Sequence, residues 1–290
     1  MASTEAIAAQ RVPALTPEVQ AQLQQLVVDS HWNQLPADWA QFFQLGTLYA
    51  VRDARGAITA SGAVLPMGAP SAPGPAVSWI SMILVTPAQR GQGLGRAVFA
   101  SCLAQVLAED RVPMLDATPQ GEALYTQFGF EPQWRFTRWR RAQHGAAPGA
   151  THKALPLADG IEPLLRLDAQ ALGFERAALL RGLAGREGAV CLRLGGATAL
   201  LRPGRTATQI GPLHAGNEAE GAALLDAIAT ALPGALVIDV PQGRTHMAAS
   251  LQAAGFTPER AFARMVRSAG RALAPARTAI VQAVAGPEYA

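Results

Sequence analysis

The sequence of 290 residues repeats itself, and this repeat limits the possible folds more than any other feature. Residues 112–120 read Val-Pro-Met-Leu-Asp-Ala-Thr-Pro-Gln, and residues 235–242 read Ala-Leu-Val-Ile-Asp-Val-Pro-Gln. In the same way, Tyr-Thr-Gln-Phe-Gly-Phe at 125–130 is echoed by Leu-Gln-Ala-Ala-Gly-Phe at 251–256. A tandem duplication of one unit is the simplest explanation of both echoes.

Both halves also show the same predicted order of elements: two helices, three strands, a helix, a strand, a helix and a last strand. The first half has predicted helices at 16–30, 37–44, 94–108 and 121–127, and strands at 48–52, 57–65, 77–85, 114–117 and 130–139. The second has predicted helices at 161–172, 176–183, 218–232 and 245–254, and strands at 189–194, 197–202, 207–212, 236–240 and 256–266. This order predicts the α/β class. A stretch rich in Ala, Gly and Pro interrupts the pattern, so we expect domains at 1–141 and 153–290 joined by a linker at 142–152.

The composition is that of a packed globular protein, because 50% of the residues are hydrophobic and only 16% are charged. The 23 arginines and single lysine are spread along the chain, and a net charge of +3 is small, so nucleic acid is not an expected partner. No apolar run reaches the roughly 18–20 residues of a membrane span. Cys102 and Cys191 lie far apart, with no CxxC pair and no secretory signal. We expect a cytoplasmic protein that does not bind membranes.

A glycine-rich turn follows the strand that ends in Ile83, Leu84 and Val85 and leads directly into a helix. The turn reads Arg90-Gly91-Gln92-Gly93-Leu94-Gly95-Arg96. Because glycine has no Cβ, the backbone can curl around an anion and point successive N–H groups at it. The helix N-terminus adds unpaired donors and a partial positive charge. This turn therefore predicts a pyrophosphate site, with Arg90 or Arg96 close enough to assist.

Three alternatives apply to this turn. The dinucleotide fingerprint GxGxxG fails because Arg96 stands where the third glycine would be, and the turn follows several strands rather than the first. The nucleotide P-loop needs a Gly-Lys-Ser/Thr sequence, and the only lysine, Lys153, is in the other half. A glycine-rich strand–helix turn without any ligand remains open.

The turn and its surroundings resemble the Gcn5-related N-acetyltransferase (GNAT) superfamily. Arg90–Gly95 matches that superfamily's Arg/Gln-x-x-Gly-x-Gly/Ala loop, and Leu124-Tyr125 followed by Gly129-Phe130 matches its Leu-Tyr-x-x-x-Gly-Phe motif. The resemblance implies two mixed, mostly antiparallel sheets flanked by helices. It also implies acetyl-CoA as co-substrate, with no metal. In the superfamily, the strand before the loop splays away from its neighbour. The residues that contact acetyl-CoA would lie at the end of this strand and in the loop, together with Thr118, which stands where the superfamily usually has an Asn. These residues are Ile83, Leu84, Val85, Arg90, Gly91, Gln92, Gly93, Leu94, Gly95, Arg96 and Thr118.

The resemblance is closer to one subgroup, in which a second acetyltransferase-like domain of the YitH/HolE type follows the first. Its marks in this sequence cover nearly the whole chain from about Trp32 to Val266. They are Trp32-Asn33-Gln34, Asp38-Trp39, Trp79–Met82, Leu115–Pro119, Leu172–Arg176 and Arg202–Arg205.

Acetyl transfer to an amine requires loss of a proton from the amine, stabilisation of the carbonyl oxygen and protonation of the leaving thiolate. The resemblance assigns the last role to Tyr125; the alternative is a buried ring with a satisfied hydroxyl. Backbone N–H groups near Leu84 or Val85 could polarise the carbonyl. Asp116 could act as the base or anchor its turn. His31 and Asp38 are further candidates, so the base is left unassigned, and Trp32, Asn33, Gln34 and Asp116 are the predicted substrate residues.

The second half has lost the features of a cofactor site. The matching turn reads His214-Ala-Gly-Asn-Glu218-Ala-Glu220, where two acidic side chains would repel a pyrophosphate, and the tyrosine position is Leu251. We expect this half to wall off the substrate cleft, or to bury apolar surface against the first half or the partner of a homodimer. The predicted function is transfer of an acetyl group from acetyl-CoA to a primary amine of a small molecule by direct attack in a ternary complex. The alternative is a non-catalytic acyl-CoA sensor or interaction module.

Overall fold

The computed structural model describes residues 8–68, 76–142, 160–268, 270–271 and 277–290. The linker predicted at 142–152 lies outside these residues except for Ala142, so the division into domains at 1–141 and 153–290 stays a prediction.

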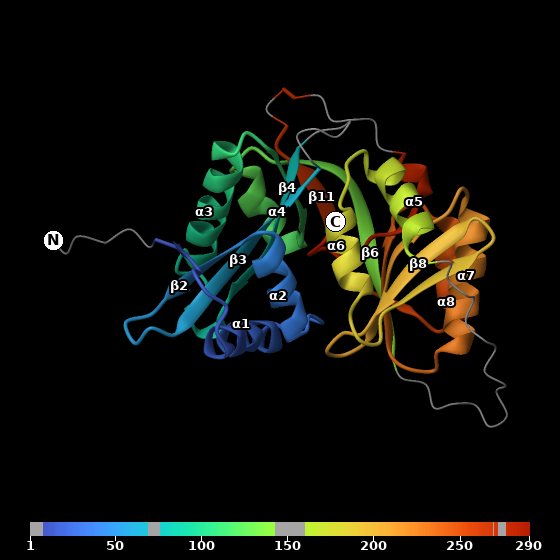
Figure 1. The fold of residues 1–290 in the computed structure, drawn as a ribbon, viewed down its shortest axis with the longest axis horizontal. Coiled ribbons are helices and arrows are strands. Elements are labelled where there is room, and N and C mark those ends of the chain that lie inside the picture. Colours follow the sequence, from blue (N-terminus) through green and yellow to red (C-terminus); the bar gives the residue numbers. More distant parts are fainter. Residues whose placement is uncertain (1–7, 69–75, 143–159, 269, 272–276) are drawn as a thin grey trace.

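The described residues form one mixed sheet of 12 strands, in the order β1-β2-β3-β4-β5-β11-β6-β10-β9-β8-β7, with β12 paired to β9 (Figure 1). The pairs β4–β5 and β9–β10 are parallel and the others are antiparallel. The predicted α/β class with mostly antiparallel pairing is confirmed. The strands are β1 (Gln10–Arg11), β2 (Thr47–Arg52), β3 (Ile58–Met67), β4 (Val77–Val85), β5 (Val112–Ala117), β6 (Glu131–Arg141), β7 (Val190–Leu194), β8 (Ala197–Arg202), β9 (Thr208–His214), β10 (Leu236–Pro241), β11 (Thr257–Val266) and β12 (Val281–Ala283).

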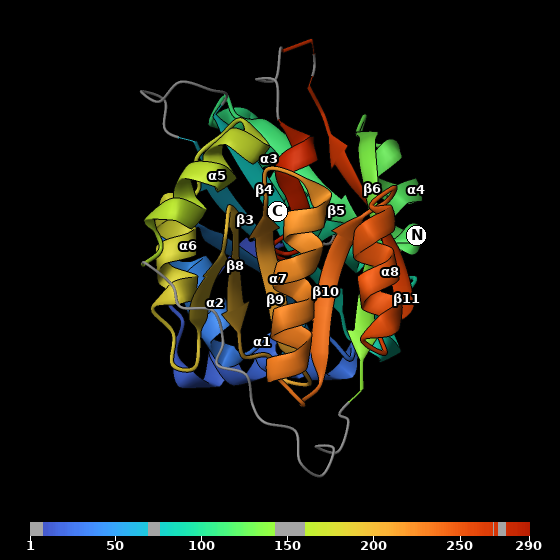
Figure 2. The ribbon, with the colours of Figure 1, turned by 90° about the vertical axis from the view of Figure 1, so that its right-hand side faces the viewer.

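The helices follow the predicted positions closely because the sequence marks their starts. Thr16 caps the first helix by accepting a hydrogen bond from Val19 N, and Pro17 occupies its first position. In the first half α3 packs on β3 and β4, and in the second α7 packs on β8 and lies beside α8 (Figure 2). No helix within the described ranges has the length and apolar character needed to cross a membrane. The helices are α1 (Pro17–Asp29), α2 (Pro36–Leu45), α3 (Leu94–Ala108), α4 (Pro119–Thr126), α5 (Glu162–Leu172), α6 (Ala177–Ala184), α7 (Glu218–Ala231) and α8 (Thr245–Ala253), with 3₁₀ turns η1 (Pro87–Gln89) and η2 (Thr278–Ile280).

The two halves exchange their last long strands, so the expectation of two sheets was wrong. Strand β11 from the second half lies between β5 and β6 of the first half, and β6 continues the sheet to β10. In Figure 1 these two strands run through the middle of the molecule, between the blue-green and the yellow-orange parts. Each half is therefore completed by a strand of the other.

Side chains at the junction explain the exchange. Phe136 on β6 and Phe262 on β11 face each other and stack with ring centroids 5.0 Å apart. On either side of this pair, a buried aspartate of one half meets an arginine of the other at 2.8–3.0 Å. The two ion pairs are Asp116 with Arg264 and Asp239 with Arg138. Because buried charges need partners, neither half can satisfy its own aspartate in the same way without the exchanged strand.

The last described segment was not predicted as structure. After η2 and β12 the chain turns back to the centre of the molecule, where the C end lies in Figure 1. A turn closes it, in which Tyr289 N donates to Gly286 O at 2.9 Å. The Tyr289 ring stacks on Phe42 at 5.1 Å, and its hydroxyl donates to Asp38 Oδ1 at 2.6 Å. This segment packs the second half against α2 of the first.

Substitution of Gly62 by alanine should destabilise the protein. A Cβ at Gly62 would lie 2.5 Å from Val98 Cγ1, 2.8 Å from Ile83 Cδ1 and 3.0 Å from Cys102 Sγ, so α3 could not sit as close to β3. We expect a loss of about 1–3 kcal/mol of unfolding free energy in urea denaturation, as for other overpacked cores. Gly234→Ala is the control, because its Cβ would meet nothing within 4 Å. Equal midpoints for the two variants would contradict the packing described for α3.

Candidate active site

The glycine-rich turn presents a row of free backbone donors at the N-terminus of α3. Gly91 and Gly93 have φ values of +77° and +86°, which favour glycine, and Gly93 is the N-cap residue. A Cβ on either would point into open space. The N–H groups of residues 91–96 donate to no other group in the described part of the chain. Unpaired amides at the positive end of a helix form an anion site, so the geometry fits a pyrophosphate.

Arg90 and Arg96 flank these donors and brace the turn. Arg90 Nε donates to Val85 O at 3.2 Å, and Arg96 Nη1 donates to Gln127 Oε1 at 2.8 Å. The Arg96 guanidinium also lies 4.8 Å from the centroid of the Phe128 ring. Arg96 therefore links the start of α3 to the end of α4, the helix that carries Tyr125. The other predicted residues of the turn, Gln92, Leu94 and Gly95, lie between the two arginines.

Strand β4 separates from β5 just before the turn, as the resemblance implied. The two strands pair only at Val77–Trp79 with Val112–Met114, although both continue for several residues. Opposite β3, a bulge lies between Ser81 and Leu84, where Met82 has a φ of +55° and its carbonyl accepts a hydrogen bond from Ser61 Oγ at 3.0 Å. Ile83 and Val85 lie on this stretch too. The divergence opens a wedge between β4 and β5.

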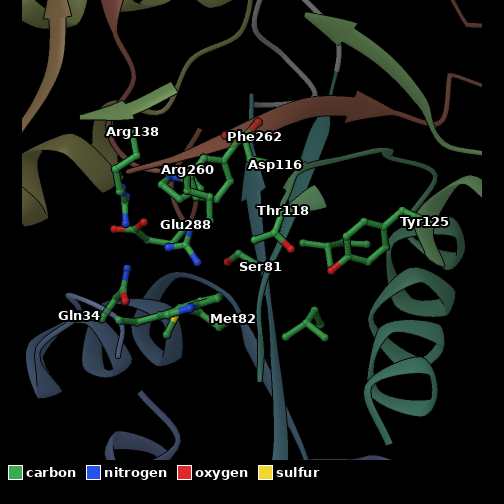
Figure 3. A pocket seen from close by; sticks show the side chains of 14 residues that line it. Gln34, Ser81, Met82, Asp116, Thr118, Tyr125, Arg138, Arg260, Phe262 and Glu288 are labelled. Carbon is green, nitrogen blue, oxygen red and sulfur yellow. The ribbon is translucent and has the colours of Figure 1, made fainter. Parts of the chain in front are cut away.

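A pocket occupies this wedge and extends to the second half (Figure 3). Figure 3 shows Tyr125 at one end and Glu288 with Gln34 at the other, with Ser81 and Thr118 between them. The pocket is thus built from β4, β5, α4, the exchanged strands and the last segment of the chain. Its lining residues are Trp32, Gln34, Ile80, Ser81, Met82, Ile83, Asp116, Thr118, Tyr125, Arg138, Arg260, Phe262, Pro287 and Glu288.

Tyr125 lines the pocket with a free hydroxyl. Its half-buried ring lies 4.6 Å from Phe99 by centroids, and among the described residues no group hydrogen-bonds to the hydroxyl. Burial raises the pKa of Tyr125, with a further rise from Cys102. The phenol therefore keeps its proton at neutral pH and can donate it.

Thr118 and Asp116 also line the pocket, but both have structural partners. Thr118 Oγ1 caps α4 by accepting from Gly121 N at 3.2 Å. Asp116 accepts two hydrogen bonds from Arg264, at 3.0 and 2.9 Å, while the Arg264 guanidinium lies between the rings of Trp79 and Trp134. Burial raises the pKa of Asp116 to about 6, although Arg264 opposes the rise. The substrate role of Asp116 stays a prediction.

The predicted triplet Trp32-Asn33-Gln34 is divided. Trp32 and Gln34 line the pocket, whereas Asn33 turns to the second half. Asn33 Oδ1 accepts from Thr206 N at 2.9 Å and from Ala207 N at 3.1 Å, and its Nδ2 donates to Ala207 O at 3.0 Å. The side chain is buried in these contacts, so the structure gives Asn33 a position that joins the two halves.

Sequence reasoning missed the pocket residues that the fold brings from afar. Arg260 and Phe262 arrive with β11, and Pro287 and Glu288 arrive with the segment after β12. A signal existed for the strands, because Phe136-Thr-Arg138 and Phe262-Ala-Arg264 are equivalent positions of the repeat. No comparable signal exists for Glu288, since the first half has no counterpart of its segment.

The corresponding turn of the second half is acidic, and a side chain caps the helix that follows it. Asn217 caps α7 by accepting from Glu220 N at 3.0 Å, and Glu218 Oε1 accepts from Met247 N at 3.1 Å. His214, buried at the end of β9, lies with Nε2 2.8 Å from Asp168 Oδ1. In the residues that the structure describes, no group of three or more His, Cys, Asp or Glu side chains could hold a metal.

Comparisons with known proteins identify both halves. Two family models, each described as an acetyltransferase (GNAT) domain, match residues 66–137 and 164–279. No match was found among the curated proteins.

Solved structures share the fold over most of the chain. A candidate acetyltransferase from Pyrococcus horikoshii is 16% identical, with a TM-score of 0.74 over 98% of this chain and 96% of that one. A tandem GNAT protein from the clavulanic acid biosynthesis pathway is also 16% identical, with a TM-score of 0.59 over 92% and 98%. A probable N-acyltransferase from Enterococcus faecalis is 11% identical, with a TM-score of 0.54 over 89% and 72%. At these identities the likeness shows the fold alone, and the YitH/HolE subgroup stays a prediction. With a GNAT model matched in each half and the site geometry above, the chain belongs to the GNAT acyltransferase superfamily as a tandem protein.

Proposed function

We propose that this protein transfers the acetyl group of acetyl-CoA to the primary amine of a small molecule, by direct attack in a ternary complex. One observation carries the proposal: β4, which diverges from β5 around the pocket lined by the free hydroxyl of Tyr125, leads directly to the free donors at the start of α3. An anion site and a proton donor beside one diverging strand are what acyl transfer from a CoA thioester requires.

The residues have separate roles in this proposal. Bound acetyl-CoA would supply the thioester. The amides of residues 91–96 hold the pyrophosphate, assisted by Arg90 and Arg96. The backbone of Ile83, Leu84 and Val85 orients the thioester and polarises its carbonyl. The amine nitrogen bonds to the carbonyl carbon, and the carbon–sulfur bond breaks. Tyr125 gives its hydroxyl proton to the sulfur, and the proton lost by the amine passes to solvent, from which Tyr125 is protonated again.

The second half has a supporting role in this proposal. The turn before α7 has no glycine of positive φ, Asn217 accepts from Glu220 N at the start of the helix, and Glu218 and Glu220 place negative charge there. We infer that the second half binds no CoA and completes the acceptor end of the pocket through Arg260, Phe262 and Glu288. A non-catalytic acyl-CoA sensor is the alternative, supported by the absence of an assigned base and by the capping role of Thr118.

Replacement of Gly93 by glutamate tests the proposed cofactor site. The new carboxylate would enter the open space before α3 and repel a pyrophosphate, so we expect the Kd for acetyl-CoA to rise at least ~100-fold and release of CoA thiol with an amine panel to stop. Gly243→Glu is a matched control, because Gly243 has a φ of +87° and is equally open but lies in the β10–α8 turn. If Gly93→Glu kept wild-type affinity, the cofactor would bind elsewhere.

A further inference from the structure

Several buried polar atoms without partners belong to residues that line the pocket. Four buried side-chain atoms of its lining make no hydrogen bond: Gln34 Oε1, Ser81 Oγ, Arg260 Nε and Glu288 Oε2. Buried polar atoms in folded proteins are nearly always paired, so a group of four around one cavity indicates a polar ligand that pairs them. Two of these atoms are hydrogen-bond acceptors, one is a donor and the serine hydroxyl can be either.

Among the charged side chains around the pocket, Arg260 has no carboxylate partner in the described residues. Each nearby buried carboxylate has its own arginine partner, in the pairs Asp116–Arg264, Asp239–Arg138 and Glu288–Arg202. Arg260 makes no ion pair or hydrogen bond with the described residues, and its guanidinium lies 5.1 Å from the centroid of the Phe262 ring. Burial lowers the pKa of Arg260, and Arg138 lowers it further, yet a guanidinium stays charged. An anionic group of the ligand would pair it.

Glu288 offers the opposite chemistry. The turn at Gly286–Tyr289 holds it, and Trp79 Nε1 donates to Pro287 O at 3.1 Å. Glu288 Oε1 accepts from Arg202 Nη2 at 2.8 Å, whereas Oε2 is unpaired. Burial raises the pKa of Glu288, and Arg202 opposes this rise. The side chain lies at the same end of the pocket as Gln34 (Figure 3). This end therefore has two unpaired acceptors, Glu288 Oε2 and Gln34 Oε1, that could bind the N–H groups of a ligand.

We propose that the acceptor is a small amine that also carries a carboxylate, of which a free amino acid is the simplest example. Its carboxylate binds Arg260, and its amino group donates to Glu288 Oε2 and Gln34 Oε1. The proposal rests on the proposed acetyltransferase function, because it names the acceptor class of that reaction.

A panel of amino acids, each tested beside its carboxamide, measures the carboxylate preference. With acetyl-CoA and the wild-type protein, we expect kcat/KM for the best amino acid to exceed that of its amide roughly 10- to 100-fold. Arg260→Gln should lower kcat/KM for the amino acid much more than for its amide, so that the preference for the acid is lost. Arg166→Gln, which removes an exposed arginine of α5, should change neither. Equal rates for acid and amide, or a loss in Arg260→Gln that is the same for both, would overturn the proposal.

The amino-group contact has its own variant. Glu288→Gln keeps an oxygen that can accept from Arg202 but replaces the free acceptor with an NH₂ group. We expect the KM for the amino acid to rise ~10-fold while the Kd for acetyl-CoA stays at the wild-type value. An unchanged KM would remove Glu288 from the acceptor site.

Two further arms separate the sources of failure. If Arg260 instead binds a carboxylate on the acyl chain, the wild type should prefer succinyl-CoA to acetyl-CoA with a neutral amide acceptor, and Arg260→Gln should lose that preference; this result would contradict the proposal. Calorimetric binding of the amino acids and their amides in the presence of CoA tests the subsite without turnover. Binding of an amino acid that weakens in Arg260→Gln, in a protein that acetylates nothing, would support the subsite and refute the acetyltransferase function. Equal binding of acids and amides would refute the subsite.

Discussion

Replacement of Arg176 by methionine should lower the free energy of unfolding by about 3–5 kcal/mol, the usual loss when one member of a buried ion pair is removed. Arg176 is buried and donates to both carboxylate oxygens of Asp168, at 2.9 and 2.6 Å, and also to Tyr289 O and Ala290 O. Methionine has a similar volume but no donors. It would leave Asp168 with His214 as its remaining side-chain partner. It would also leave Tyr289 O unpaired and Ala290 O with Ala285 N as its remaining donor.

The structure also explains why this site should be sensitive. Burial raises the pKa of Asp168, but Arg176 and His214 outweigh burial and hold the pKa below its ordinary value. Asp168 therefore stays ionised, and an unpaired buried carboxylate is costly.

Urea unfolding followed by circular dichroism gives the measurement. Arg181→Met is the control, because Arg181 is exposed on α6 and pairs with Glu162 in solvent, so its midpoint should stay close to that of the wild type. Equal midpoints for the two variants would show that the buried network does not stabilise the fold.

Replacement of Tyr125 by phenylalanine should lower kcat about 10²- to 10⁴-fold, the range for removal of a general acid. The ring packing on Phe99 would be kept, and the amides at residues 91–96 would be untouched. The Kd for acetyl-CoA should therefore remain at the wild-type value. A loss confined to turnover would separate the role of the hydroxyl from any effect on folding or binding.

Tyr49→Phe is a matched control for this experiment. Tyr49 on β2 is also half-buried, and its hydroxyl likewise makes no hydrogen bond with the described residues. Tyr49→Phe should keep full turnover. If Tyr125→Phe kept full turnover as well, the thiolate would be protonated by another group. A wild-type chain that binds acetyl-CoA but acetylates no amine would instead favour the sensor.

The elements were predictable because their signals are local. Thr16 and Pro17 mark the start of α1, and the glycines at 91 and 93 mark both the start of α3 and its anion site. Tyr125 was predictable for the same reason, because it belongs to the short motif Leu124-Tyr125 followed by Gly129-Phe130. Such features depend on neighbours in the sequence, so a single chain displays them.

The pairing between the halves was not predictable in this way. The strand at β6 was recognised, but its alternation of side chains does not show whether it pairs with its own half or with the other. That choice depends on Arg138 meeting Asp239, about a hundred positions away, and on Phe136 meeting Phe262. Glu288 was missed for a related reason. Its place in the pocket depends on hydrogen bonds from Arg202 to Glu288 and from Trp79 to Pro287, and both donors lie far away in the sequence.

Calorimetric titration of the purified chain with acetyl-CoA tests the central claim most directly, because it gives the affinity and the number of sites together. We expect a single site per chain, lost in Gly93→Glu and kept in Gly243→Glu. Two sites per chain would contradict the inference that the second half binds no CoA, and no binding would contradict the acetyltransferase function itself.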